Sequence, residues 1–315
     1  MSNTPSKIAV ADIESVRYSA PDLGLMEEFL ADFGLERVHR NANLLYMRGA
    51  GPDAFVHVTE LGPVRPVGFA LKARSLEDLH ALARHGGTTV MERDAPGGGR
   101  VVTLADPDAN RLEIVFGAAQ SVPSLSRAPF EANVGPRRPR AVEVVRTTAR
   151  ASEVLRLGHV SLFTAQFAAM HAFYHDVLGL RDSDSYYGGH EGNTIASFMH
   201  CGLERQLVDH HTVALLGLGR TGYDHAAFEV LDLDDLMRGN QFLQARGKWR
   251  HSWGIGRHFE GSQIFDYWRD PFGNKVEHWT DGDLVNDDYQ KGHSSFDPAT
   301  DLAQWGPPLT TDFLS

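Results

Sequence analysis

The second half of the chain repeats the order of segments found in the first half, and this repeat limits the fold more than any other feature. A strand, then a helix with an apolar stripe that ends at a glycine, is predicted by both LRLGHVSLFTAQFAAMHAFYHDVLGL and IESVRYSAPDLGLMEEFLADFGL. A strand, an acidic turn and a second helix follow in HAAFEVLDLDDLMRGNQFLQARGK and in GFALKARSLEDLHALARHGGTT. Two strands joined by an Asp-Pro turn close each half, in YWRDPFGNKVEHW and in TLADPDANRLEIV. Each half is therefore predicted to contain two strand-helix-strands modules.

The repeat also divides the chain into predicted domains. We expect an N-terminal domain over residues 1–117 and a C-terminal domain over residues 154–282. Residues 118–153 are rich in Ser, Pro, Arg and Ala without periodicity, which predicts a surface linker. Residues 283–315 are polar but carry spaced aromatic residues, so we expect a tail that packs on the body, and we hypothesise that it acts as a lid.

Composition excludes several classes of protein. The chain has 315 residues, enough for two cores, and a net charge of −11, which disfavours a nucleic-acid surface or an anionic membrane patch. No apolar run reaches membrane-spanning length, and the opening MSNTPSKIAV lacks the regions of a secretory signal. Cys201 is the only cysteine, so no intramolecular disulfide can form. We therefore expect a cytoplasmic protein that binds neither nucleic acid nor a membrane.

Three polar residues on strand-like segments of the second half are candidate metal ligands: His159, His225 and Glu277. Taken singly, a buried histidine is more often a hydrogen-bonded core residue, but these three occupy corresponding positions of repeated modules. Two imidazoles and one carboxylate form the ligand set that holds non-heme Fe(II) and leaves positions open. The same set also suits a catalytic zinc ion. The corresponding positions of the first half are read as Arg17, Gly68 and Glu113.

Other side chains with acid-base chemistry lie in the same half. His211 follows His210 at the start of an apolar strand, and His258 lies in the glycine-rich segment GIGRHFEGS. Tyr267 lies ten positions before Glu277 across the Asp-Pro turn, so a hairpin would place these two residues on adjacent strands. The alternatives are an exposed edge for the two neighbouring histidines, a turn residue at His258, and core packing for Tyr267.

These segments resemble the type I extradiol ring-cleavage dioxygenases of the vicinal oxygen chelate (glyoxalase/bleomycin resistance/dioxygenase) superfamily. GRHFEGSQIFDYWRDPFGNKVEHW is similar to the family pattern of His, Tyr, a turn and Glu, while LGHV and DHAAFEV resemble the two metal-histidine segments. DHHTVAL resembles the segment of the acid-base histidine, which corresponds to His211. The resemblance implies an α+β fold of two domains, each of two βαβββ modules whose mixed sheet curls around a central cavity.

The resemblance further implies Fe(II), or alternatively Mn(II), held by the three ligands, with O2 as co-substrate. It implies meta cleavage of a substituted catechol to a 2-hydroxymuconic-semialdehyde-type product in aromatic catabolism. Tyr267 would assist deprotonation of the diol, His258 would position the substrate, and His211 would act as acid. Family members often form homo-oligomers, so we expect one, and a tetramer in particular. Aromatic wall candidates are Phe163, Phe198, Trp253, Phe265 and Trp268.

Two positions depart from relatives and leave rival functions open. Ser161 stands where some relatives have Asn, and Gly261 stands where some have Asp, which puts the substrate's substituents in doubt. One alternative is a hydroquinone ring-cleaving dioxygenase. Others are a superfamily enzyme with another metal, such as a glyoxalase-like isomerase or a zinc hydrolase, and a non-catalytic protein that binds an aromatic compound.

Overall fold

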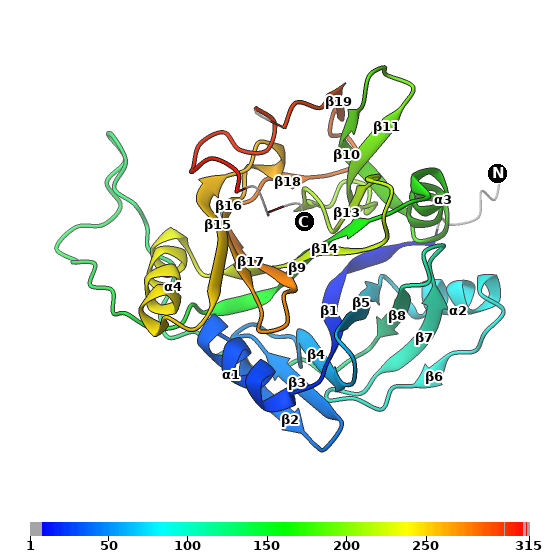
Figure 1. Ribbon diagram of the computed structural model, residues 1–315, viewed down its shortest axis with the longest axis horizontal. Coiled ribbons are helices and arrows are strands. Elements are labelled where there is room, and N and C mark those ends of the chain that lie inside the picture. The colour runs from blue at the N-terminus through cyan, green and yellow to red at the C-terminus, as the bar shows by residue number, and fades with distance from the viewer. Residues whose placement is uncertain (1–7, 299, 311–312, 314–315) are drawn as a thin grey trace.

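The computed structural model describes residues 8–298, 300–310 and 313, and most of its strands form two large mixed sheets (Figure 1). The predicted start of the first domain at residue 1 and the end of the tail at residue 315 lie outside the described residues. The first sheet has eight strands in the order β2-β3-β4-β1-β5-β8-β7-β6. Their bounds are β1 (Val10–Ala20), β2 (Glu36–Arg40), β3 (Leu44–Arg48), β4 (His57–Leu61), β5 (Arg65–Ala73), β6 (Met91–Glu92), β7 (Arg100–Ala105) and β8 (Arg111–Phe116).

The second sheet has nine strands in the order β15-β16-β17-β14-β9-β13-β11-β10-β19. Their bounds are β9 (Val154–Phe163), β10 (Leu180–Tyr187), β11 (Thr194–Cys201), β13 (Val213–Leu216), β14 (Gly222–Val230), β15 (Arg250–Arg257), β16 (Ile264–Arg269), β17 (Lys275–Thr280) and β19 (Gly292–Ser295). A separate pair joins β12 (Val208–Asp209) to β18 (Leu284–Val285). The tail therefore contributes strands to the second half, as β19 pairs with β10.

Helices are few among the described residues. They are α1 (Leu23–Phe33), α2 (Leu76–His85), α3 (Phe167–Ala172) with its π-helical continuation η1 (Phe173–Val177), α4 (Leu233–Arg246) and the 3-10 turn η2 (Glu260–Ser262). None of them has the length and apolar character needed to span a bilayer. The prediction of an α+β fold with mixed sheets is confirmed by this arrangement.

Local sequence explains where the longer helices begin and end. The carboxylate of Asp22 accepts hydrogen bonds from the first turn of α1, and the carboxylate of Asp232 does the same for α4. Both helices end at a glycine with positive φ, Gly34 and Gly247, a conformation that disfavours side chains with a Cβ.

The two Asp-Pro turns form as predicted. The side chain of Asp270 accepts hydrogen bonds from the backbone N–H of Phe272 and of Asn274, at 2.8 and 2.9 Å. Asp106 makes the matching bond to the N–H of Asn110 at 2.9 Å. Because each carboxylate fixes its turn, the strands on either side pair in register as β16–β17 and β7–β8.

One continuous apolar core joins the two halves. Strands β1 and β9 lie against each other (Figure 1), and buried residues of both sheets belong to one cluster. At this junction the imidazole of His278 on β17 donates to the backbone carbonyl of Phe33 at 2.7 Å and stacks on the Phe33 ring. Residues 118–153 form a long, mostly exposed loop beside α4, without helices or named strands. The domain boundaries themselves stay a prediction.

Candidate active site

The three candidate ligands lie on neighbouring strands of the second sheet. His159 is on β9, His225 on β14 and Glu277 on β17, and β14 pairs with the other two strands. Within this pairing Ala227 lies opposite both His159 and Glu277. A small methyl group at this position leaves the space between the two polar side chains free, so all three can converge.

The three side chains meet at nearly equal separations. The Nε2 atoms of His159 and His225 are 3.2 Å apart, and Oε2 of Glu277 is 3.4 and 3.3 Å from them respectively. Ligand atoms that bind one ion at about 2.1 Å lie roughly 3 Å from one another. The arrangement therefore fits a common metal ion, and the donor set of two imidazoles and a carboxylate suits a divalent transition metal.

The environment of Glu277 supports the same fit. Its side chain is 0% exposed, and within the described part of the protein neither carboxylate oxygen has a hydrogen-bond partner. A buried charge without hydrogen bonds is costly unless a cation compensates it. Burial acts to raise the pKa of Glu277, but the imidazoles of His159, His258 and His225 lower it further, so the net pKa lies well below its usual range. Glu277 is thus an ionised carboxylate that is suited to bind a cation.

A pair of charged side chains orients His225. Nδ1 of His225 donates to the carboxylate of Asp224 at 2.8 Å, and Nζ of Lys275 donates to the other oxygen of that carboxylate at 2.6 Å. Asp224 and Lys275 are both buried. A carboxylate on the far nitrogen fixes the imidazole and directs its Nε2 lone pair inward, which is the usual support of a metal-binding histidine. Sequence reasoning did not identify Asp224 and Lys275, although each directly precedes or pairs with His225.

Tyr267 and His258 form a hydrogen-bonded pair beside the ligands. Tyr267 on β16 lies directly opposite Glu277 on β17, as the hairpin prediction requires. Nδ1 of His258 donates to the carbonyl of Leu302 at 2.8 Å, so in the neutral ring Nε2 accepts from the Tyr267 hydroxyl, also at 2.8 Å. Burial and the negative charge of Glu277 raise the pKa of Tyr267 well above its usual value. The phenol therefore keeps its proton until a stronger base or a charge change acts on it.

His211 lies against the ligands from the other side. Its ring centroid is 4.2 Å from that of His159, and its Nδ1 is 3.1 Å from Nδ1 of His210. Nε2 of His210 is bonded to the carboxylate of Asp184 at 2.7 Å. If His210 donates to Asp184, its Nδ1 accepts from His211, and Nε2 of His211 is left as a free lone pair. Burial, and then the neighbouring imidazoles of His159 and His210, lower the pKa of His211 well below its usual value, so it is a neutral base.

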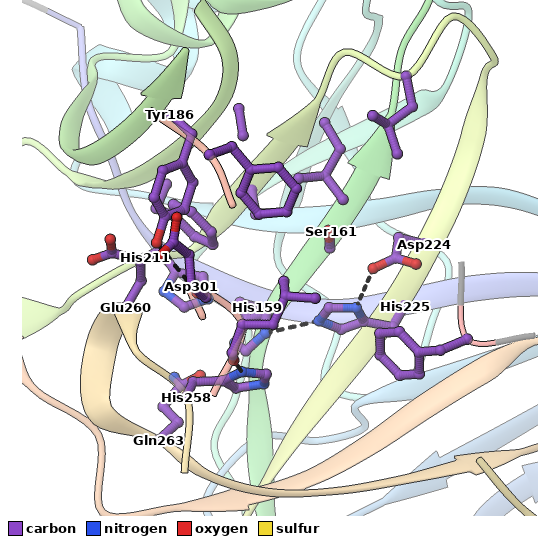
Figure 2. A pocket seen from close by; sticks show the side chains of 18 of the residues that line it. His159, Ser161, Tyr186, His211, Asp224, His225, His258, Glu260, Gln263 and Asp301 are labelled. Carbon is purple, nitrogen blue, oxygen red and sulfur yellow. Dashed lines mark hydrogen bonds and ion pairs between the residues drawn. The ribbon is translucent and has the colours of Figure 1, made fainter. Parts of the chain in front are cut away.

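These groups line one cavity of about 160 Å³ (Figure 2). All of the predicted site residues except Glu277, which lies beneath them at 0% exposure, belong to its lining. Of the predicted aromatic walls, Phe198 and Trp253 line the cavity, whereas Phe163, Phe265 and Trp268 do not. The lining that sequence reasoning missed includes Glu260 of η2 and residues of β10, β11 and the tail: Tyr186, Ile195, Phe296, Asp301, Leu302 and Phe313.

Known proteins resemble this chain over most of its length. Residues 156–278 match the family model described as Glyoxalase/Bleomycin resistance protein/Dioxygenase superfamily. The chain is 30% identical over 308 residues to Metapyrocatechase 2 of Cupriavidus necator, covering 97% of this chain and 92% of that protein.

Two solved structures share the fold over nearly the whole chain. The crystal structure of the Mn(II)-bound glyoxalase from Novosphingobium aromaticivorans has a TM-score of 0.77 at 26% identity, covering 98% of this chain and 94% of that one. Homoprotocatechuate 2,3-dioxygenase of Brevibacterium fuscum, in complex with 3,4-dihydroxyphenylacetate, has a TM-score of 0.78 at 19% identity, covering 98% and 93%.

Proposed function

The chain belongs to the type I extradiol dioxygenases of the Glyoxalase/Bleomycin resistance protein/Dioxygenase superfamily, and from this membership we propose that it cleaves a catechol ring beside its diol, with O2 and bound Fe(II). One observation supports this proposal above the others. The two-histidine, one-carboxylate cluster lies at a mainly apolar cavity together with Tyr267, His258 and His211, three groups able to hold or move protons.

His159, His225 and Glu277 are the proposed metal ligands. The ion would bring the diol and O2 together and conduct electrons between them. The chain's own contribution is the geometry of the ligands: Asp224 and Lys275 hold His225, and the strand pairing of β9, β14 and β17 sets the separations. Mn(II) would fit the same ligands, so the choice of Fe(II) is part of the proposal.

Tyr267 and His258 are proposed to handle the first proton. A diol hydroxyl beside the phenol oxygen can pass its proton into the hydrogen bond between Tyr267 and Nε2 of His258. The carbonyl of Leu302 keeps Nδ1 of His258 protonated, so the accepted proton makes an imidazolium held between two acceptors. His258 also fixes the orientation of the ring at this side of the cavity.

His211 is proposed to act on the opposite side. Its free Nε2 can take up a proton and return it when the ring opens, and the imidazole of His210 lies at its other nitrogen. Because His211 is 4% exposed, bulk water does not compete for this position. The apolar walls bind the ring by burying its surface and keep water away from the reacting atoms.

Turnover after anaerobic reconstitution tests the function. Metal-free protein is loaded with Fe(II), mixed with catechol and alkylcatechols, and then exposed to O2 in an oxygen electrode. Uptake of one O2 per substrate, with a new yellow absorbance, is the expected result. Zn(II)-loaded protein is the control, because zinc supports no O2 chemistry. Iron-loaded protein that consumes no O2 with any catechol, or with hydroquinone only, would overturn the proposal.

The Novosphingobium glyoxalase likeness favours a second candidate, a metal-dependent isomerase. This function needs a metal with open positions but no oxygen. It is tested by adding Mn(II)-loaded protein to the hemithioacetal of methylglyoxal and glutathione under nitrogen. Turnover of the hemithioacetal, without cleavage of any catechol, would favour the isomerase over the dioxygenase.

We also propose a cytoplasmic homo-oligomer, with a tetramer as the specific expectation, and a tail that covers the cavity. Light scattering after size exclusion measures the number of subunits. Truncation after Asp283 tests the tail, since the tail residues Leu302 and Phe313 line the cavity. Unchanged catechol KM and turnover in the truncated protein would exclude a role of the tail as a lid.

A further inference from the structure

The cavity wall presents acidic side chains and no permanent cation. In the part of the chain that the structure describes, its lining includes Asp224, Glu260 and Asp301 but no lysine or arginine. Asp224 is balanced by Lys275 and bonded to His225. Among the described residues neither Glu260 nor Asp301 has a lysine or arginine partner, so no permanent cation faces a substrate beside them.

Glu260 and Asp301 lie on the side of the cavity remote from His225 (Figure 2). The hydroxyl of Tyr186 reaches the backbone carbonyl of Asp301 at 3.3 Å. The carboxylate of Asp301 accepts from the N–H of Asp297 at 2.7 Å and from the hydroxyl of Thr300 at 2.8 Å, both neutral donors. Burial, together with the negative charge of Asp184, raises the pKa of Glu260 to about 7, so Glu260 carries only part of a negative charge near neutral pH.

Nearby cations are committed elsewhere. Arg257, at the end of β15, donates to the carbonyl of Ser262 and pairs with Asp281 at 2.7 Å. Lys275 is buried between Asp224 and the face of the Phe313 ring. A carboxylate entering the cavity could therefore recruit Lys275 only by breaking a buried pair. Arg257 would have to give up its bonds to Ser262 and Asp281.

The remaining walls on this side are apolar or aromatic. A catechol whose diol faces the metal ligands would direct its ring substituent toward them. They are Tyr186, Ile195, Phe198, Leu218, Phe296 and Leu302.

We propose, building on the ring-cleavage function above, that this enzyme selects catechols with an uncharged apolar substituent and rejects catechols that carry a carboxylate. Glu260 and Asp301 are the specificity-determining residues. A carboxylate loses its hydration on entering an apolar cavity, and here it meets like charge instead of a compensating cation. An alkyl or aryl group gains from burial against the same walls.

The test compares substrates that differ in charge alone. Iron-loaded full-length protein is assayed with 3,4-dihydroxyphenylacetate, with the corresponding amide, and with 4-ethylcatechol. We expect kcat/KM for the amide to exceed that for the acid by roughly 100-fold, with 4-ethylcatechol higher still. Equal kcat/KM for acid and amide would overturn the specificity while leaving ring cleavage standing. Failure to cleave all three, and catechol itself, would instead count against the proposed function.

Variants locate the cause of the discrimination. Glu260→Gln with Asp301→Asn removes both ionisable groups and keeps the shapes, and should raise the acid-to-amide ratio of kcat/KM at least about tenfold. Asp288→Asn is the matched control, because it removes one charge from the same tail at an exposed position outside the cavity lining, and should leave that ratio unchanged. An unchanged ratio in the double variant, measured on protein with wild-type thermal stability, would overturn the role of these carboxylates.

Discussion

The two halves of the molecule build the same three-strand framework and use it differently. In the second half β14 pairs His225 with Lys275 and Ala227 with Glu277. In the first half β5 pairs Gly68 with Arg111 and Ala70 with Glu113 in the same parallel register. The carboxylate at the end of this pattern is present in both halves, so the difference lies in what surrounds it.

The pairing corrects one equivalence suggested by the sequence. His159 lies opposite Ala227, and the residue opposite Ala70 in the first half is Ser15. Arg17, two positions further on, pairs with Gly68 and so corresponds to Ser161 instead. Each antiparallel pairing has register shifts near these residues, which the sequence pattern does not reveal, so the predicted equivalence of Arg17 with His159 was wrong.

The side chains around Glu113 and Glu277 differ in their charge. Glu113 has three arginines around it: Arg111 at 2.7 Å, Arg17 at 3.3 Å and Arg93 at 3.5 Å. Among the described residues, the ion-pair partners of Glu277 are imidazoles, at 3.3 to 3.7 Å. Permanent cations neutralise Glu113, whereas Glu277 has none and is left for the metal ion that we propose.

The largest effect that tests this comparison is expected from Glu277→Gln. The amide keeps the shape but removes the charge and one ligand oxygen, so metal content should fall and ring cleavage should drop by on the order of 1,000-fold. Metal analysis and O2 uptake measure both. Glu113→Gln changes the equivalent position and should leave metal content as in wild type. Equal metal loss in both variants would end the distinction between the halves.

A second test concerns Gly68, the residue of the first half that corresponds to His225 and has no side chain. A Cβ at Gly68 would lie 1.8 Å from the carbonyl oxygen of Arg111, so no histidine can be grafted without moving β8. Gly68→Ala should lower the free energy of unfolding by about 2–3 kcal/mol, measured by urea denaturation. Gly192→Ala is the control, since its Cβ would meet only ordinary contacts. An unchanged free energy of unfolding in Gly68→Ala would show that β8 can shift to make room for the Cβ.

A third, smaller effect separates Lys275 from its counterpart Arg111. Lys275→Met leaves Asp224 buried without its cation, which weakens its hold on His225 and should reduce metal affinity roughly 10–100-fold. Arg111→Met removes one of three arginines around Glu113 and should not alter metal affinity. Competition with a fluorescent chelator gives both values. The idea fails if the two variants bind metal alike.

The smallest expected effect is a dependence of folding stability on pH. Burial acts to raise the pKa of Asp224, but Lys275 and His225 lower it further, to a net value well below the usual 3.8. A depressed carboxyl pKa stabilises the folded state above the unfolded-state pKa and loses this contribution as pH falls through the folded-state pKa. The stability difference between wild type and Asp224→Asn should thus be constant from pH 7 to about 5 and shrink below about pH 4. Tryptophan fluorescence follows it in the second half, where all five tryptophans lie. A difference that grows on acidification would contradict the assignment.

Short-range sequence patterns predicted much of the fold and indicated the candidate ligands. Asp270 and Asp106 fix turns within five residues, so the hairpin that pairs Tyr267 with Glu277 could be predicted from the sequence. A helix with an apolar stripe was also expected at α3, and the stripe that the core buries consists of Met170, Tyr174 and Leu178.

Other parts of the site depend on contacts between distant segments. Asp301, Leu302 and Phe313 reach the cavity because the tail pairs through β19 with β10, a contact no periodicity encodes. Lys275 supports His225 only because β14 and β17 are parallel neighbours in one register. Such partners become visible only once the sheet is assembled.

The hydrogen bond from His278 to the carbonyl of Phe33 joins the two halves of the chain. His278 is the residue after Glu277, and it anchors the ligand strand on the last turn of α1. Separate expression of either half would therefore expose the core of both. Selection for an intact second half would then also preserve the first half, because the first half supports the strand that carries Glu277.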